Sequence, residues 1–296
     1  MKHYRVLEKA RECSIDSLKH LSLFKLNRNK YNLVHNFGRL AFLLPILNHK
    51  VNKIMTYGRI ISKKNISLIN KLPNKNIKYT APSDWCVSTG NVSGEWYTVH
   101  NAIDFSKYTL VDKVSSDAPI IFLSRLERLK GAHEAIQIAL ETGNRLILAG
   151  NISNLPDEKR YFEEEIKPFI DGVLIQYVGT LDDEGKNKYL GMAKAMLFPA
   201  RTEEAFGMVM IEAMACGTPS IYSNCCAQLE FAEGKGFPVN IIGEKTANSN
   251  DYGRYVMSEL PGNYYEPDFN HLSNVMRHVY ENYDDCKEKS FEESID

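Results

Sequence analysis

The chain has 296 residues, 44% of them hydrophobic and 25% charged, which is enough to bury the cores of two medium domains. Its most hydrophobic run, residues 40–47, is too short to span a bilayer, and residues 1–12 lack the apolar core of a signal peptide. The cysteines have no metal-site spacing, and they are Cys13, Cys86, Cys216, Cys225, Cys226 and Cys286. These features argue against a membrane-spanning, exported or disulfide-stabilised protein and favour a cytoplasmic one with reduced thiols.

The net charge of −1 conceals an asymmetry between the two ends of the chain. Residues 1–80 hold 17 Lys and Arg against 3 Asp and Glu, whereas residues 81–296 hold 19 against 34. Because the basic residues are interleaved with apolar ones, we expect residues 1–80 to face an anionic membrane surface, which would make the protein peripheral on the cytoplasmic face. Nucleic acid is disfavoured because no recognition motif accompanies the charge, and solvated surface lysines are the alternative. The apolar stripe at residues 15–24 predicts either a sheet-covering helix or a membrane-surface helix.

Strand signals that end in glycine alternate with helical patterns from residue 31 onward. YNLVHNFG (31–38) and VNKIMTYG (51–58) predict strands, RLAFLLPILNH (39–49) predicts a helix between them, and residues 76–104 predict short strands and turns. We therefore expect a partial N-terminal α/β domain over residues 1–104. Residues 105–117 are polar and unpatterned, so we expect a linker there, at the start of a second domain over residues 105–296.

The alternation is clearer in the second domain. Predicted strands are 118–124, 144–151, 173–179, 195–200 and 218–223, and predicted helices are 131–142, 156–169, a segment through Tyr189, 208–216 and 267–283, followed by a frayed charged end. This order is typical of a parallel sheet with covering helices. Glycine and polar residues follow each strand, so we expect a ligand crevice at the carboxyl edge of the sheet.

The predicted helix at 208–216 is apolar on nearly every face except for Glu212. A carboxylate in a buried helix is costly to desolvate, so Glu212 is expected to face a ligand or a fixed hydrogen-bond donor. Arg125 and Lys130 follow the first strand of the domain and should lie at the same edge as the helix start at Phe206-Gly207. Two cations and a helix N-terminus at one crevice predict a diphosphate clamp. Glu212 would then bind ribose or sugar hydroxyls, and Glu204 those of a donor group.

Five segments in order resemble the motifs of the family 4 retaining glycosyltransferases, which have the GT-B fold. They are VHNAID (99–104), SRLERLKG (124–131), LILAGN (146–151), YVGTLDDE (177–184) and EAFGMVMIEAMACGTP (204–219), the last with the family's two glutamates separated by seven residues. The resemblance spans residues 31–233 and implies two Rossmann-like domains with parallel sheets.

The resemblance also implies roles for particular residues. Arg125 and Lys130 would neutralise the leaving diphosphate, Glu212 would hold the ribose and Glu204 the donor sugar. The remaining donor contacts would come from the backbone of Phe206, Gly207 and Met208, and from Val178 and Gly179 beside the base. His35, in VHNFG (34–38), resembles the first histidine of the family's V-H-x-H stretch, although Phe37 replaces the second one. Family members retain configuration without a metal or other cofactor, and accordingly we expect neither here.

The chain departs from the family at its N-terminus. Only about 30 residues precede the strand at 31–38, so the N-terminal domain is expected to be incomplete and to lack the glycine-rich loop that approaches donor and acceptor. Either a truncated product or a reduced homologue would account for this. A partial sheet has an unpaired edge, which favours self-association.

These inferences lead to three hypotheses. The first is transfer of a hexose or N-acetylhexosamine from a UDP- or GDP-sugar to a glycan or lipid-linked acceptor, as in polysaccharide or lipopolysaccharide biosynthesis. The second is a catalytically incomplete nucleotide-sugar-binding homologue that acts as a regulatory or partner subunit. The third, a nucleotide-sugar epimerase, is disfavoured by the two-glutamate motif.

Overall fold

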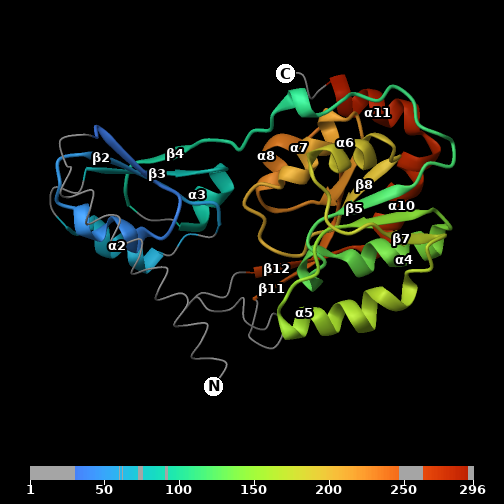
Figure 1. Cartoon of the computed structure of the whole chain (residues 1–296), viewed down its shortest axis with the longest axis horizontal. Coiled ribbons are helices and arrows are strands. Elements are labelled where there is room, and N and C mark those ends of the chain that lie inside the picture. The colour runs from blue at the N-terminus through green and yellow to red at the C-terminus, as the bar shows by residue number, and fades with distance from the viewer. Residues whose placement is uncertain are drawn as a thin grey trace. The chain divides into compact units, whose positions relative to one another are not determined.

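The computed structural model describes residues 31–59, 61, 63–72, 76–90, 93–246 and 263–292. The chain divides into two compact units, residues 1–100 and 101–296 (Figure 1). Residues 1–30 lie outside the described residues, and with them the apolar stripe at 15–24, Cys13 and all the basic residues before Tyr31. In the part of the chain that is described, no helix combines the length and the apolar character needed to cross a bilayer.

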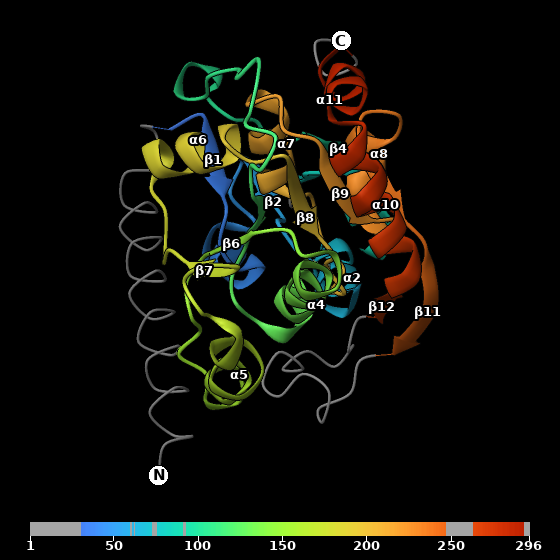
Figure 2. The same ribbon diagram turned by 90° about the vertical axis from the view of Figure 1, so that its right-hand side faces the viewer.

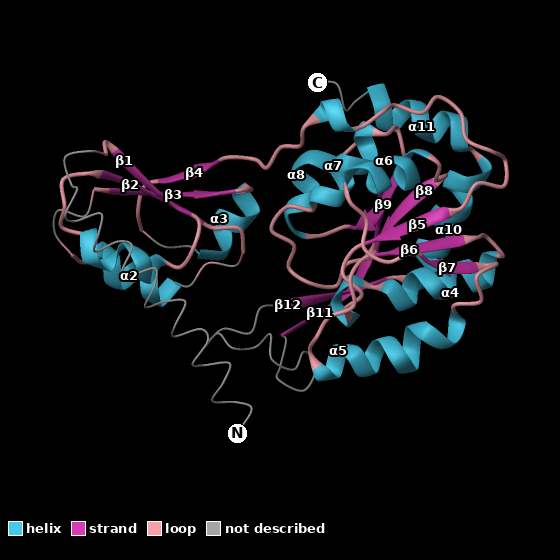
Figure 3. Ribbon diagram, in the orientation of Figure 1, coloured by secondary structure: helices cyan, strands magenta, loops and turns pink. Residues whose placement is uncertain are grey.

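Unit 1 contains a parallel four-stranded sheet in the order β1-β2-β3-β4. Its strands are Leu33–Asn36 (β1), Asn52–Thr56 (β2), Ile77–Ala81 (β3) and Trp96–Thr98 (β4). Helix α2 (Lys63–Asn70) runs along one side of this sheet (Figure 3) and buries Ile66 and Ile69 in a core with Met55 and Tyr79. The parallel sheet expected from the glycine-ended strands is confirmed.

Two segments of unit 1 differ from the sequence expectation. Residues 84–90, predicted as strands and turns, form the short helix α3 (Asp84–Gly90), where the Ser83 hydroxyl accepts from the Cys86 N–H. The segment after β1 forms a 3-10 helix, Leu40–Ile46, instead of an α-helix. Pro45 lies inside it and has no N–H to continue an α-helical ladder.

Unit 2 is built on a six-stranded parallel sheet in the order β10-β9-β8-β5-β6-β7. The strands are Ile120–Leu123 (β5), Leu146–Ala149 (β6), Ile175–Tyr177 (β7), Ala195–Phe198 (β8), Ser220–Ser223 (β9) and Phe237–Val239 (β10). Every residue of β5, β6, β8 and β9 is buried, because helices cover both faces of the sheet. A separate antiparallel pair joins β11 (Ile241–Thr246) to β12 (Asn263–Pro267).

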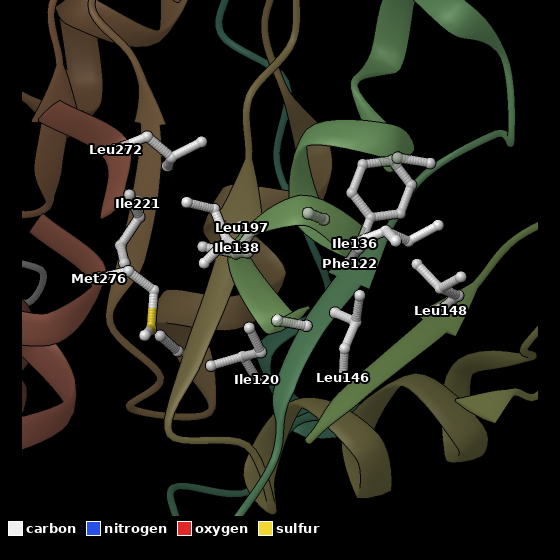
Figure 4. Close-up of a cluster of buried hydrophobic side chains, with 14 of the residues drawn as sticks. Ile120, Phe122, Ile136, Ile138, Leu146, Leu148, Leu197, Ile221, Leu272 and Met276 are labelled. Carbon is white, nitrogen blue, oxygen red and sulfur yellow. The ribbon is translucent and has the colours of Figure 1, made fainter. Parts of the chain in front are cut away.

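The helices of unit 2 form two layers around this sheet (Figure 2). Their bounds are Ala132–Thr142 (α4), Pro156–Tyr161 (α5), Asp183–Gly191 (α6), Met208–Ala215 (α7), Leu229–Ala232 (α8), Phe269–Glu281 (α10) and Tyr283–Glu292 (α11). Ile120 and Phe122 of β5 point into a core shared with α4 and α10 (Figure 4), whereas Ile121 and Leu123 point into a second core with α6 and α7. The charged end expected to fray is instead helical as far as Glu292.

The strand order locates the natural ligand edge of unit 2. From β5 the chain moves outward through β6 and β7, and it then returns to place β8 on the other side of β5. The connections therefore diverge between β5 and β8, and open parallel sheets bind ligands at the carboxyl ends of strands at such a switch point. The loops that follow β5 and β8 carry Arg125, Lys130 and Glu204.

Candidate active site

Close backbone contacts hold the loops at this edge together. Gly150, which follows β6, has a φ of +143°, and a Cβ there would overlap the carbonyl oxygen of Ser124 after β5. Its N–H donates to the Gly179 carbonyl after β7 at 2.8 Å, and the N–H of Arg201 after β8 donates to the Leu129 carbonyl at 2.8 Å. The four loops thus form one continuous rim.

Lys130 and Glu204 meet on this rim although they are 74 residues apart in sequence. The Lys130 Nζ lies 2.5 Å from Glu204 Oε2, and the side chains are only 10% and 20% exposed. Each needs the other because a poorly hydrated charge is costly when it is unpaired. The two residues predicted to contact donor phosphate and donor sugar therefore neutralise one another.

Arg125 lies on the same rim with a more open side chain, 48% exposed. Its guanidinium pairs with the buried carboxylate of Glu127 at 2.7 Å. Glu127 thereby fixes the direction of a cation that still reaches solvent, which is the arrangement expected of an anion-binding group.

Helix α7 begins on the rim at Gly207. This residue has a φ of +99°, in the left-handed region that favours glycine, and as a glycine N-cap it has no side chain with which to cap the helix. Phe206 is buried and stacks on Phe231 with ring centroids 4.7 Å apart, which fixes the turn into the helix. The uncapped end directs backbone N–H groups and a partial positive charge toward the rim.

Glu212 is buried in the middle of α7, as expected, and the predicted hydrogen-bond donor is Lys186 of α6. The Lys186 Nζ lies 2.6 Å from Glu212 Oε1 and 3.4 Å from the Tyr108 hydroxyl. Burial lowers the pKa of Lys186, but the Glu212 carboxylate more than offsets this, and the net shift is upward. Lys186 is therefore a cation when Glu212 is ionised.

The remaining predicted residues are divided between the two units. Val178 and Gly179 follow β7 on the rim, with a φ of +77° at Gly179. His35 belongs to unit 1, where its Nε2 lies 2.7 Å from the Thr56 hydroxyl near the carboxyl end of that sheet. Unit 2 thus brings Arg125, Lys130, Glu204 and Gly179 to one rim, with Glu212 on the helix that begins there, and their roles stay predictions.

Sequence reasoning missed several charged partners in this region. Lys186, Glu134 and Arg201 lie outside the motifs singled out above, and their pairings with Glu212 and with each other cross 26 and 67 positions of sequence. Glu127, the partner of Arg125, was also not singled out. The segment at 105–117, expected as a linker, also contacts α6, since Lys107 pairs with Asp183 at 2.7 Å and the Thr109 N–H donates to Asn187 Oδ1 at 2.7 Å. Of these residues only Glu127, inside SRLERLKG, could have been suspected from the sequence.

Within the described ranges, no group of three or more His, Cys, Asp and Glu residues could hold a metal ion. The described cysteines are all buried thiols without a disulfide, including the adjacent Cys225 and Cys226.

The fold and the rim define this chain as a GT-B protein, and solved structures of that class share the fold. A glycosyltransferase from Rickettsia africae ESF-5 matches 95% of this chain and 76% of its own, with a TM-score of 0.71 and 16% identity. Anabaena Alr3699/HepE, solved in complex with UDP and glucose, matches 91% of this chain and 77% of its own, with a TM-score of 0.63 and 16% identity.

The sequence of unit 2 carries the similarity to a known family. Residues 111–248 match the family described as "Glycosyl transferases group 1". A phosphatidyl-myo-inositol mannosyltransferase of Propionibacterium freudenreichii subsp. shermanii is 32% identical over 138 residues, which is 45% of this chain. The match covers only about a third, 34%, of that relative's length.

Proposed function

We propose that the protein transfers a hexose or N-acetylhexosamine from a UDP- or GDP-sugar to a glycan or lipid-linked acceptor, with retention of configuration. The observation that carries the proposal is the convergence at one sheet edge of Arg125, the Lys130–Glu204 pair, Glu212 and the uncapped start of α7. The resemblance to the family 4 enzymes supplies the reaction and its stereochemistry.

In this proposal the donor diphosphate lies between the α7 N-terminus and the two cations. Lys130 would exchange its contact with Glu204 for the phosphate oxygens, which frees the Glu204 carboxylate to accept hydrogen bonds from donor-sugar hydroxyls. The negative charge that develops on the leaving phosphate would be stabilised by groups already held in place. The leaving phosphate would itself help to remove the acceptor proton, so the chain needs no nucleophile or metal.

Two relatives support a hexosyl donor without deciding the nucleotide. The solved HepE complex contains UDP and glucose, and the Propionibacterium relative is named as a mannosyltransferase that acts on phosphatidyl-myo-inositol. A lipid-linked acceptor would also suit the basic residues of 1–80, through which we propose peripheral contact with an anionic cytoplasmic membrane face. The edge strands β1 and β4 of the described sheet offer a route to self-association.

The second candidate is a nucleotide-sugar-binding subunit without turnover. It is favoured by the position of the family match, residues 111–248, which lies within unit 2 and so supports donor binding more directly than transfer. Binding without turnover, followed by activity when a partner protein is added, would support this alternative.

The test measures release of UDP or GDP from a panel that includes UDP-glucose, UDP-N-acetylglucosamine and GDP-mannose. Lys130→Ala and Glu204→Ala should each lower kcat by about 100-fold or more, the usual cost of losing a preorganised charge stabiliser. Arg160→Ala serves as the control, because Arg160 is a solvent-exposed partner of Asp157 on α5. His35→Ala should lower turnover and leave nucleotide affinity unchanged, since His35 belongs to unit 1. Unchanged turnover in both the Lys130 and the Glu204 variants would refute the assignment.

A further inference from the structure

The Glu212 carboxylate is held by a chain of contacts that reaches outside α7. Lys186 of α6 contacts it at 2.6 Å, and both side chains are largely buried, 21% and 10% exposed. Tyr108 places its hydroxyl 3.4 Å from the Lys186 Nζ, and Asp183 Oδ1 lies 3.3 Å from the same atom. Lys186 is therefore fixed from three directions.

The segment that carries Tyr108 is itself attached along α6 and α7. Lys107 pairs with Asp183, the Thr109 N–H donates to Asn187, and the Val111 N–H donates to the Cys216 carbonyl at 3.2 Å. Gly191 at the end of α6 has no room for a Cβ because the Val111 side chain packs against it. These contacts hold Tyr108 over Lys186 before any ligand binds.

We propose that Lys186 is a positioning residue of the nucleotide site, which pairs with the Glu212 carboxylate and directs it at the ribose, with Tyr108 holding Lys186 in place. The inference rests on the proposed function, because it assumes that Glu212 binds the nucleotide.

The chemistry of the ribose explains why the direction of the Glu212 carboxylate matters. A carboxylate accepts hydrogen bonds and can take one from each of two neighbouring hydroxyls when its oxygens are held toward them. Glu212 lies on a helix whose other buried residues are Met210, Ala213 and Met214, so its charge needs a partner. The Cys216 thiol cannot provide one, because a thiol is either neutral or anionic and never a cation.

The experiment compares the affinities of UDP and 2′-deoxy-UDP, and of GDP and 2′-deoxy-GDP, by isothermal titration calorimetry on the full chain. The wild-type protein should bind one ribonucleotide about 10-fold or more tightly than its deoxy form, the value of a hydrogen bond to a charged group. Lys186→Met should weaken ribonucleotide binding by about 10-fold and bring the two affinities close together. Lys186→Arg, which keeps the charge, should retain most of the preference.

Lys188→Met is the matched control, because Lys188 lies on the exposed side of the same helix, over the Tyr189 ring. It makes the same change of charge and should retain the ribose preference. Tyr108→Phe removes only the hydroxyl near Lys186 and should reduce the ribose preference by a smaller factor. This variant keeps the proposal testable if Lys186→Met does not fold. Thermal unfolding of each variant verifies the fold.

The outcomes distinguish a failure of the proposed function from a failure of the role proposed for Lys186. If the wild-type protein binds neither UDP nor GDP, the proposed function fails. If it binds with a ribose preference that Lys186→Met and Tyr108→Phe retain, the role of Lys186 is refuted and the proposed function stands. If the wild type binds both sugar forms equally, Glu212 does not read the ribose and the inference is overturned.

Discussion

Individual glycines decide how closely the loops of the site approach one another. Gly150 combines a positive φ with a backbone carbonyl where a side chain would start, and Gly131 does the same against the Pro199 carbonyl. In both cases the neighbour is backbone, which cannot move aside as a flexible side chain can. Gly143, at the end of α4, has a φ of +71° with open space around it.

Gly150→Ala should therefore be more destabilising than Gly143→Ala. At Gly143 an alanine has only to adopt the left-handed conformation, which lowers the free energy of unfolding by about 1 kcal/mol. At Gly150 it also collides with Ser124, and we expect a loss of about 3 kcal/mol or more in the free energy of unfolding. Urea denaturation of both variants with unchanged m-values measures the difference. Equal losses in the free energy of unfolding for the two variants would show that Ser124 and Gly150 can move apart without destabilising the protein.

At the scale of elements, a buried ion pair attaches the loop after β8 to α4. Arg201 Nε lies 2.5 Å from Glu134 Oε1, and Glu134 Oε2 lies 3.0 Å from His133 Nε2. These contacts are ion pairs without hydrogen-bond geometry, because Arg201 Nε and both Glu134 oxygens have no well-aligned hydrogen-bond partner among the described residues. The loop that they hold continues into Glu204 and the start of α7.

Arg201→Met should destabilise the protein by about 2–3 kcal/mol, because it leaves Glu134 buried without its cation. Adding Glu134→Leu should recover most of the loss, since the double variant removes both charges. Arg160→Met, which breaks the exposed pair with Asp157, should cost less than about 0.5 kcal/mol. Chemical denaturation of the four proteins gives the coupling energy, and a double variant no better than Arg201→Met would contradict the ion-pair account.

At the scale of the whole molecule, both units bury tyrosines that resist ionisation. Burial raises the pKa of Tyr79 in unit 1, and of Tyr222 and Tyr283 in unit 2, from 10.0 to about 12, with a small added contribution from nearby carboxylates for the latter two. The folded chain then keeps protons that the unfolded chain releases. The stabilising contribution is complete below pH 10 and is lost as the pH rises toward 12.

We expect the free energy of unfolding to fall between pH 10 and 12, by about 1.4 kcal/mol per pH unit for each proton retained. Tyr222→Phe should make this fall shallower for unit 2, and Tyr79→Phe should do so for unit 1. Denaturation at pH 8, 10 and 11, with tyrosinate absorbance followed in parallel, measures the slope. Tyr97→Phe is the control, since Tyr97 is 45% exposed. If neither core variant changes the slope of the free energy of unfolding against pH, groups other than these tyrosines cause the loss of stability at high pH.

The sequence by itself determined the parallel α/β architecture and the positions of the rim residues on it. Apolar runs that end in glycine and polar residues predict buried parallel strands. The spacing of Glu204 and Glu212 places the first in the loop before a helix and the second in the middle of that helix. The errors at α3, at Leu40–Ile46 and at the C-terminal helix fall where short segments have ambiguous local preferences. There tertiary packing selects the conformation.

The tertiary structure alone decided which charges meet. Lys130 reaches Glu204 because β8 returns beside β5, and Glu212 reaches Lys186 because α6 and α7 cover the same face of the sheet. Local periodicity predicts neither contact, because both contacts depend on the order of the strands in the sheet. Local sequence can show that a buried charge requires a partner, whereas the identity of that partner comes from contacts between segments far apart along the chain.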